Sequence, residues 1–217
     1  LCTSSIGMVP VQEPVAASGF LQHADYNAPV TLPRILGDGM VLQRDHTIPV
    51  WGRTHPGAAV RVSFAGTVQY TLADHNGNWN VSFQPMRAGG PYVLKVNDKV
   101  VNDILIGDVW LFSGQSNIEL QVRRVAIRYP VEASTYTNTQ IREFRTTTHY
   151  DFHGPLWDVP EGRWKKCVQE EIPEFSALAF FFGMEWNQRH NVPVGLIVNG
   201  VGGSPLDAWL DEATLRG

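Results

Sequence analysis

The chain divides into two segments with different patterns of hydrophobic and polar positions. In residues 40–108, short apolar runs alternate with turn residues, and residues 60–64 (Val-Arg-Val-Ser-Phe) alternate with a period of two, as in a half-buried strand. Turn signals such as His55-Pro56-Gly57 and Asn76-Gly77-Asn78 separate the runs. Short strands at this spacing, with no helical pattern between them, predict an antiparallel β-sandwich. The expected strands are residues 40–43, 48–52, 59–64, 68–73, 79–83, 92–96 and 100–106.

After Asp108 the pattern becomes that of an α/β fold. Residues 109–112 and 194–198 are continuously apolar, which is typical of strands buried on both faces of a parallel sheet, and residues 141–145 are a candidate third strand. Residues 175–188 carry apolar side chains at steps of three and four, which predicts a helix. Ser204 has the residue type of an N-cap and is followed by Pro205, so a further helix is expected there. This alternation predicts parallel strands joined by right-handed crossovers.

A serine stands where the first strand of the second segment turns toward a helix. The apolar run of residues 109–112 ends in Ser113-Gly114, and Gln115-Ser116-Asn117 follows. A strand fixes the backbone, a tight turn projects the serine Oγ, and the next helix offers free N–H groups and the positive end of its dipole. Ser116 is therefore a candidate nucleophile, although most serines in such turns only cap helices.

A glycine-rich turn follows the strand predicted at residues 194–198. Its sequence is Asn199-Gly-Val-Gly-Gly-Ser204, and glycines there let the backbone approach a ligand and point N–H groups at it. Both turns lie at the carboxyl edge of the predicted sheet, where open α/β sheets bind ligands. An N–H of Gly203 or Gly202, together with that of Ser116, would make a two-donor oxyanion hole.

The segment of residues 146–173 is long and rich in aromatic residues, including Trp157 and Trp164. Two interpretations stay open. It is a loop packed over the sheet, or it is one wall of a sugar site, since aromatic faces with polar tips suit carbohydrate rings.

Charge and composition exclude several classes of binding partner. The net charge is -4 with no basic cluster, which argues against nucleic acid. No apolar run reaches the length that spans a membrane. Cys2 and Cys167, the two cysteines, form neither a disulfide framework nor a metal site, and no metal or cofactor is expected.

Several separate motifs resemble one family. The run Gly107-Asp-Val-Trp-Leu-Phe-Ser-Gly-Gln-Ser-Asn117 is similar to the nucleophile block of sialate O-acetylesterases and related carbohydrate acetylesterases of the SGNH hydrolase superfamily. Met40-Val-Leu-Gln-Arg44 and Ile48-Pro-Val-Trp-Gly52 resemble their N-terminal β-domain, and Gly202-Gly-Ser-Pro-Leu-Asp-Ala-Trp209 resembles their second block. The likeness covers about residues 32–210.

This resemblance implies roles for individual residues. Ser116 would attack an acetyl ester, Gly203 would be the first oxyanion glycine with Gly202 beside it, and Gln115 and Asn117 would contact substrate. The implied fold is a mixed one, with an N-terminal extension (1–31), a β-sandwich domain (32–107) and the first part of an α/β, flavodoxin-like SGNH domain (108–217). We expect a secreted or periplasmic protein, or a lysosomal one in a eukaryote.

Two features of the family pattern are missing. No third block of the Gln-Gly-Glu type and no Asp-x-x-His follow Trp209, and His149 and His153 are the only histidines expected to approach the site. We therefore expect an N-terminal piece of a longer enzyme, whose remainder, as a second chain or fragment, supplies the base. The alternatives are a non-catalytic carbohydrate-binding or accessory protein, and a different esterase or lipase, on the same scaffold.

Overall fold

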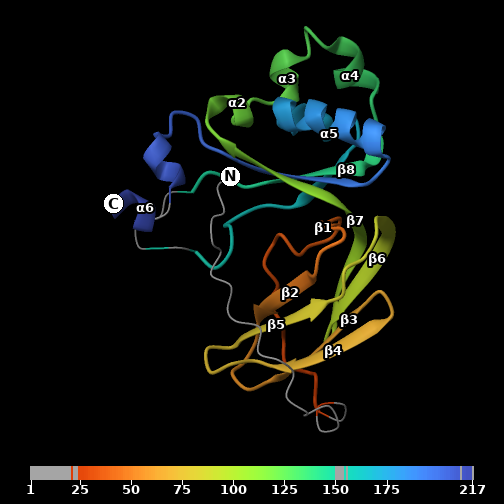
Figure 1. Cartoon of the computed structure of the whole chain (residues 1–217), viewed down its shortest axis with the longest axis vertical. Coiled ribbons are helices and arrows are strands. Elements are labelled where there is room, and N and C mark those ends of the chain that lie inside the picture. Colours follow the sequence, from red (N-terminus) through yellow and green to blue (C-terminus); the bar gives the residue numbers. More distant parts are fainter. Residues whose placement is uncertain (1–20, 22–23, 150–153, 155, 211, 217) are drawn as a thin grey trace.

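The computed structural model describes residues 21, 24–149, 154, 156–210 and 212–216. Within them, one eight-stranded sheet has the order β4-β3-β6-β7-β10-β8-β9, with β1 also paired to β7, and β2 and β5 form a two-stranded sheet (Figure 1). The strands are β1 (Val41–Gln43), β2 (Ile48–Arg53), β3 (Ala59–Phe64), β4 (Thr67–Leu72), β5 (Asn78–Phe83), β6 (Gly89–Val96), β7 (Lys99–Gly114), β8 (Asn138–Arg145), β9 (Trp164–Cys167) and β10 (Val194–Gly200).

Most of the helices gather on one side of the second half of the sheet, as Figure 1 shows for α2 to α5. None of the helices in the described residues is long and apolar enough to cross a membrane. They are α2 (Ser116–Glu119), α3 (Val122–Val125), α4 (Pro130–Thr135), α5 (Ala177–His190), α6 (Glu212–Arg216) and the 3₁₀ helices η1 (Ile172–Glu174) and η2 (Leu206–Trp209).

Strand β7 runs through both of the predicted segments. Up to residue 107 it pairs antiparallel with β6 and parallel with β1, and residues 108–114 then pair parallel with β10. Asp108 is 8% exposed and stays in the strand because its carboxylate accepts hydrogen bonds from Arg44 Nε (2.7 Å) and the Trp186 indole (2.8 Å). The boundary predicted between residues 107 and 108 falls inside this strand, and the division into domains stays a prediction.

The separate β-sandwich expected from the sequence is not confirmed. Strands form at all seven expected places, but only β2 and β5 leave the large sheet, and the others continue through β7 into the parallel part. The small sheet still covers the large one, since Phe83 of β5 packs edge-to-face on Phe64 of β3 with 5.6 Å between ring centroids. Strand β7 is therefore shared by the antiparallel and the parallel part of the large sheet.

The second segment has the α/β architecture that the sequence predicts. Strands β7, β10 and β8 are parallel neighbours, and β9 pairs antiparallel at the edge. Helix α5 begins after Ser176, whose side chain accepts a hydrogen bond from the Ala179 N–H, and ends at Asn191 in a left-handed conformation. It approaches the sheet at Gly183, where an added Cβ would lie 3.0 Å from Leu196 and 3.2 Å from Ile141. This approach buries one face of the helix that the apolar spacing indicated.

The expectation of a helix capped by Ser204 is wrong. The short helix η2 is 3₁₀ and its N-cap is Pro205, with no side-chain capping bond. The Ser204 hydroxyl instead donates to the Val201 carbonyl (2.8 Å) and accepts from the Trp209 indole (2.9 Å). These two bonds use the hydroxyl to close the glycine-rich turn, so it is not available as a cap.

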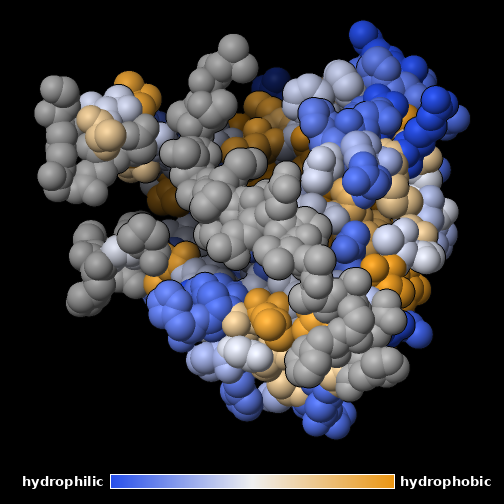
Figure 2. Space-filling view, turned by 60° about the horizontal axis from the view of Figure 1, so that its bottom comes forward, coloured by the Kyte–Doolittle hydropathy of each residue, from blue (hydrophilic) through white to orange (hydrophobic). Residues whose placement is uncertain are grey.

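Exposed large hydrophobic side chains are distributed over both segments and include Leu72, Val100, Leu111 and Leu206. On the face shown in Figure 2, hydrophobic areas stand among hydrophilic ones over the coloured part of the surface. Leu111, 60% exposed, lies in the part of β7 that pairs with β10 alone among the described strands. Residues 108–114 thus have one edge without a partner strand in the described part of the chain.

Gly107 provides a test of the continuous strand. A Cβ there would overlap the carbonyl group of Pro193, where β10 comes alongside β7, so we expect Gly107→Ala to lower the free energy of unfolding by about 3 kcal/mol. Gly57→Ala is the control: it has open space but a φ of +73°, which costs roughly 1 kcal/mol. Urea unfolding of both variants measures the difference, and equal losses would contradict the close approach.

Candidate active site

Ser116 is the first residue of α2, at the point where β7 ends. It is exposed, and Gln115 is the N-cap of the helix without a side-chain capping bond. Ile118 fixes α2 on the strand ends, because Cβ atoms at Gly114 and Gly200 would lie only 3.2 Å and 3.0 Å from its side chain. The glycines at the two strand ends let the serine-bearing turn lie directly on the sheet edge.

The glycine-rich turn lies beside Ser116. Gly200 stands opposite Gly114 in the register of β10 and β7, and the Val201 N–H donates to the Gly114 carbonyl (3.0 Å). Gly202 follows, and a Cβ there would lie 3.7 Å from the Ser116 Cβ. The structure therefore brings together the two turns that the sequence placed at one sheet edge.

The two glycines differ in what their N–H groups can do. The Gly202 N–H donates to Glu119 Oε2 (2.9 Å), whereas no hydrogen bond to the Gly203 N–H is found within the described residues. Gly203 has a φ of +79° and open space around the position of a Cβ. Gly203 is thus free to bind a developing oxyanion, and Gly202 would first have to exchange its bond to Glu119.

The side chains of Gln115 and Asn117 have different surroundings. Gln115 donates its amide N–H to the Ser204 carbonyl, which ties the serine turn to the glycine-rich turn. Asn117 is exposed on α2. Gln115 therefore already has a bond within the protein, whereas Asn117 faces solvent.

Two open hollows flank Ser116 and the glycines. The first, of about 320 Å³, is lined by Ser116, Glu119, Leu120, Gln121, Arg124 and Arg145. The second, of about 420 Å³, is lined by Asn199, Val201, Gly202, Gly203, Ser204, Pro205, Ala208 and Trp209. Neither lining contains a histidine. His149 is exposed beyond the end of β8, and His153 lies outside the described residues.

The aromatic segment supports the packing interpretation for the two tryptophans. Trp164 is 6% exposed and donates its indole N–H to the Ile35 carbonyl (2.8 Å), within the core. The ring of Trp157 lies 4.6 Å from the guanidinium of Arg53 on β2. Both contacts direct these rings toward the N-terminal strands, and neither residue lines the hollows at Ser116.

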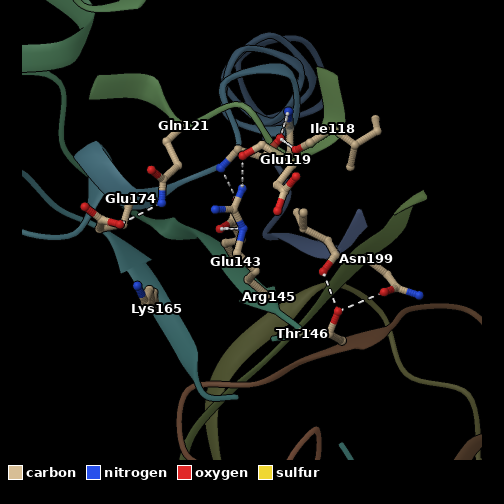
Figure 3. A network of polar contacts seen from close by, with 12 residues as sticks. Ile118, Glu119, Gln121, Glu143, Arg145, Thr146, Lys165, Glu174 and Asn199 are labelled. Atoms are coloured by element: carbon tan, nitrogen blue, oxygen red, sulfur yellow. Dashed lines mark hydrogen bonds and ion pairs between the residues drawn. The ribbon is translucent and has the colours of Figure 1, made fainter. Parts of the chain in front are cut away.

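Sequence reasoning missed three charged residues behind the serine. Glu119 binds Gly202, Arg145 donates to the Glu119 carbonyl (3.2 Å), and Glu143 is fully buried beside them (Figure 3). Burial raises the pKa of Glu143 to about 7, against the lowering effect of Arg145 and of the Ser176 N–H. A signal was present: residues 142, 143 and 145, within a candidate strand of the predicted α/β sheet, are all charged.

Comparisons with known proteins agree with these motifs. No protein-family model matches the chain. It is 30% identical to the sialate O-acetylesterase of Pongo abelii and 29% identical to that of Homo sapiens, in each case over 83% of this chain and 39% of the relative. The crystal structure of a novel carbohydrate acetylesterase from Xanthomonas citri matches with a TM-score of 0.83 and 38% identity, over 87% of this chain and 44% of that one.

The chain thus spans about two fifths of the length of the curated relatives that it matches. Its fold is close to that of a carbohydrate acetylesterase, and the resemblance seen in the sequence motifs is confirmed. Over most of its length, this chain is a sialate O-acetylesterase-like protein.

Proposed function

We propose that this chain carries the nucleophile of a carbohydrate O-acetylesterase. Ser116 Oγ attacks the acetyl carbonyl, the sugar hydroxyl leaves, and water then hydrolyses the acetyl-serine. The observation that carries the proposal is the position of Ser116 at the end of β7, with Gly202 close beside it on the neighbouring strand end. The names of the relatives agree with ester hydrolysis on a carbohydrate.

The oxyanion would be held by backbone N–H groups. The N–H of Gly203 is the first candidate because no protein acceptor occupies it in the described residues, and the N–H of Ser116 at the start of α2 is the second. Gly202 contributes once its bond to Glu119 is exchanged. Asn117 and Gln115 then contact the sugar from the serine side. This mechanism uses no metal or cofactor.

The general base and its carboxylate are expected from residues outside these 217. No described histidine lines either hollow, and the chain matches only 39% of the curated relatives' length. Residues 108–114 have one edge without a strand in the described part, which suits continuation of the sheet by the remainder of the polypeptide, as a second chain or fragment. We place the protein in a secreted or periplasmic compartment, or in the lysosome of a eukaryote.

One observation favours a second candidate function. The absence of histidine from both linings also fits a non-catalytic protein that binds carbohydrate on the same scaffold. An organophosphonate ester separates the two, because it labels an activated serine and leaves a merely exposed one unmodified. Sugar binding without labelling of Ser116 would support the binding protein.

Ser116→Ala tests the nucleophile. In the active protein that contains this chain, we expect labelling to disappear and kcat for an acetylated sugar to fall by about 10⁴-fold to 10⁶-fold, since the oxyanion and binding contributions alone remain. Mass spectrometry of the labelled protein and acetate release provide the measurements. A variant with full activity would rule out Ser116 as the nucleophile.

Gly203→Val tests the oxyanion contact. Valine does not hold a φ of +79° without strain, so the N–H moves away and kcat should fall by about 10²-fold to 10³-fold with a smaller change in KM. Gly66→Val is the matched control, because Gly66 has a φ of +81° and open space on the distant β3–β4 turn. A rise in KM with unchanged kcat for Gly203→Val would remove this role.

Expression of residues 1–217 alone tests where the base lies. We expect little turnover and a tendency to associate, because the edge of residues 108–114 stays unpaired in the described fold. Acetyl-ester hydrolysis and light scattering, compared with the longer polypeptide, give the answer. A stable monomer with normal turnover would place the base within this chain, where His149 and His153 are the candidates.

A further inference from the structure

The short helix that carries Ser116 packs on the sheet edge through the partly buried side chain of Ile118. Helix α2 contains four residues, none of them buried, and its N-cap makes no side-chain bond. Ser116 and Glu119 belong to the same turn, since the Leu120 N–H donates to the Ser116 carbonyl (2.9 Å). A shift at one end of so short a helix therefore moves the other end, and polar contacts add to the rigidity that Ile118 supplies by packing on the strand ends.

Three successive carbonyls at the end of α2 each accept a hydrogen bond from another element. The carbonyl of Ile118 accepts from the Ser176 hydroxyl (2.7 Å), and that of Leu120 accepts from the Ala177 N–H (2.7 Å). Between them, the Glu119 carbonyl accepts from Arg145 Nη2 (3.2 Å) (Figure 3). Helix ends leave such carbonyls without intrahelical partners, so these donors fix the orientation of α2.

The buried carboxylate of Glu143 contacts two of the residues that supply these donors, Ser176 and Arg145. Glu143 Oε2 accepts from the Ser176 backbone N–H (2.7 Å), and Glu143 Oε1 lies 3.7 Å from Arg145 Nε. Apart from this ion pair, Oε1 and Arg145 Nε have no hydrogen-bond partner among the described residues. The Glu143 side chain is 1% exposed. The carboxylate thus determines where both the Ser176 hydroxyl and the Arg145 guanidinium can lie.

The surroundings of Glu143 are unfavourable for a charge. Burial opposes the charge more strongly than Arg145 on the same strand, Lys165 on β9 and the Ser176 N–H at the start of α5 favour it. The other neighbours are the neutral Cys167 thiol on β9 and Leu196, which lies opposite Glu143 on β10. Buried charges in such sites commonly cost stability compared with an apolar residue of similar volume. A carboxylate here calls for a reason other than stability.

We propose that Glu143 is a positioning residue for Ser116: through Ser176 and Arg145 its carboxylate holds the carbonyl end of α2 and thereby fixes the nucleophile at the other end. The inference rests on the proposed role of Ser116. Helix α2 is also connected to the glycine-rich turn, because the Glu119 side chain accepts a hydrogen bond from the Gly202 N–H. Nucleophile and oxyanion donors are then aligned together.

Glu143→Gln in the active protein is the main test. Glutamine keeps an acceptor for the Ser176 N–H but loses the charge that holds Arg145, so kcat should fall by about 10-fold to 100-fold while KM changes by less than about 2-fold. Asn187→Ala is the matched control: Asn187 is a buried polar residue of α5 that binds Asn138 and the Val192 carbonyl, away from α2. It should lower the melting temperature and leave kcat unchanged.

A pair of substitutions at Ser176 covers the case in which Glu143→Gln does not fold. Ser176→Ala removes the hydroxyl donor to Ile118 but keeps the N–H bound to Glu143, so kcat should fall, and Ser176→Thr should restore it. The rate at which an organophosphonate labels Ser116 should fall in Glu143→Gln and in Ser176→Ala. Hydrogen exchange at the amides of residues 116–120 should rise in both.

The pH dependence of stability gives an independent readout. Because the pKa of Glu143 is raised from 4.5 to about 7, the folded state holds an extra proton between these values, and stability falls as pH rises through this window. Glu143→Gln should remove that part of the fall in melting temperature between pH 5 and pH 8. An unchanged pH dependence would mean that the carboxylate is not held as described.

Two results separate this inference from the proposed function. If the unmodified protein is not labelled at Ser116, the proposed function fails. If Ser116 is labelled and both Glu143→Gln and Ser176→Ala keep the wild-type labelling rate and kcat, the positioning role alone is overturned. The positioning role would also be overturned if Asn187→Ala lowered kcat as much as Glu143→Gln does, at an equal loss of melting temperature.

Discussion

The parallel pairing of β7 with β10 is the constraint on which the candidate site depends. Their register sets Gly114 opposite Gly200, so both strands end at the same level of the sheet and the turns that follow them lie side by side. The pairing requires a close approach where the strands first come together, since Pro193 leaves no room for a side chain at Gly107. A difference of one residue in this register would separate Ser116 from Gly202 and invert the faces of β10.

Local patterns predicted much of this fold because they reflect local forces. The positions of the seven expected strands, helix α5 and the two turns at the sheet edge follow from periodicity and turn chemistry, which operate within a few residues. The continuity of β7 could not be predicted in this way. Asp108 has the residue type of a strand end, and the groups that keep it buried, Arg44 and Trp186, come from 64 and 78 residues away.

The same limit applies to the candidate site. Ser116 and the glycines stand in motifs whose spacing can be seen in the sequence, whereas Glu119, Arg145 and Glu143 act through contacts between separate elements. Glu143 binds the residue before α5, 33 positions further along the chain. In the sequence, the charges of β8 resemble those of an exposed strand, and Arg142 and Glu143 become buried only in the folded sheet, where β8 lies between β10 and β9.

Glu143 is not the only buried charge among the described residues of this sheet, since Asp108 and Arg142 are buried too. Asp108 lies where β7 passes from β6 to β10, and Arg142 of β8 binds Asp103 of β7 and the Gly39 carbonyl. Burial alone would raise the pKa of Asp108, and the hydrogen bonds of Arg44 and Trp186 hold it below its ordinary value. Glu143 differs from these, because its partners leave its pKa raised and its carboxylate supports an exposed helix. Its charge therefore contributes to the geometry of α2 more than to the stability of the sheet.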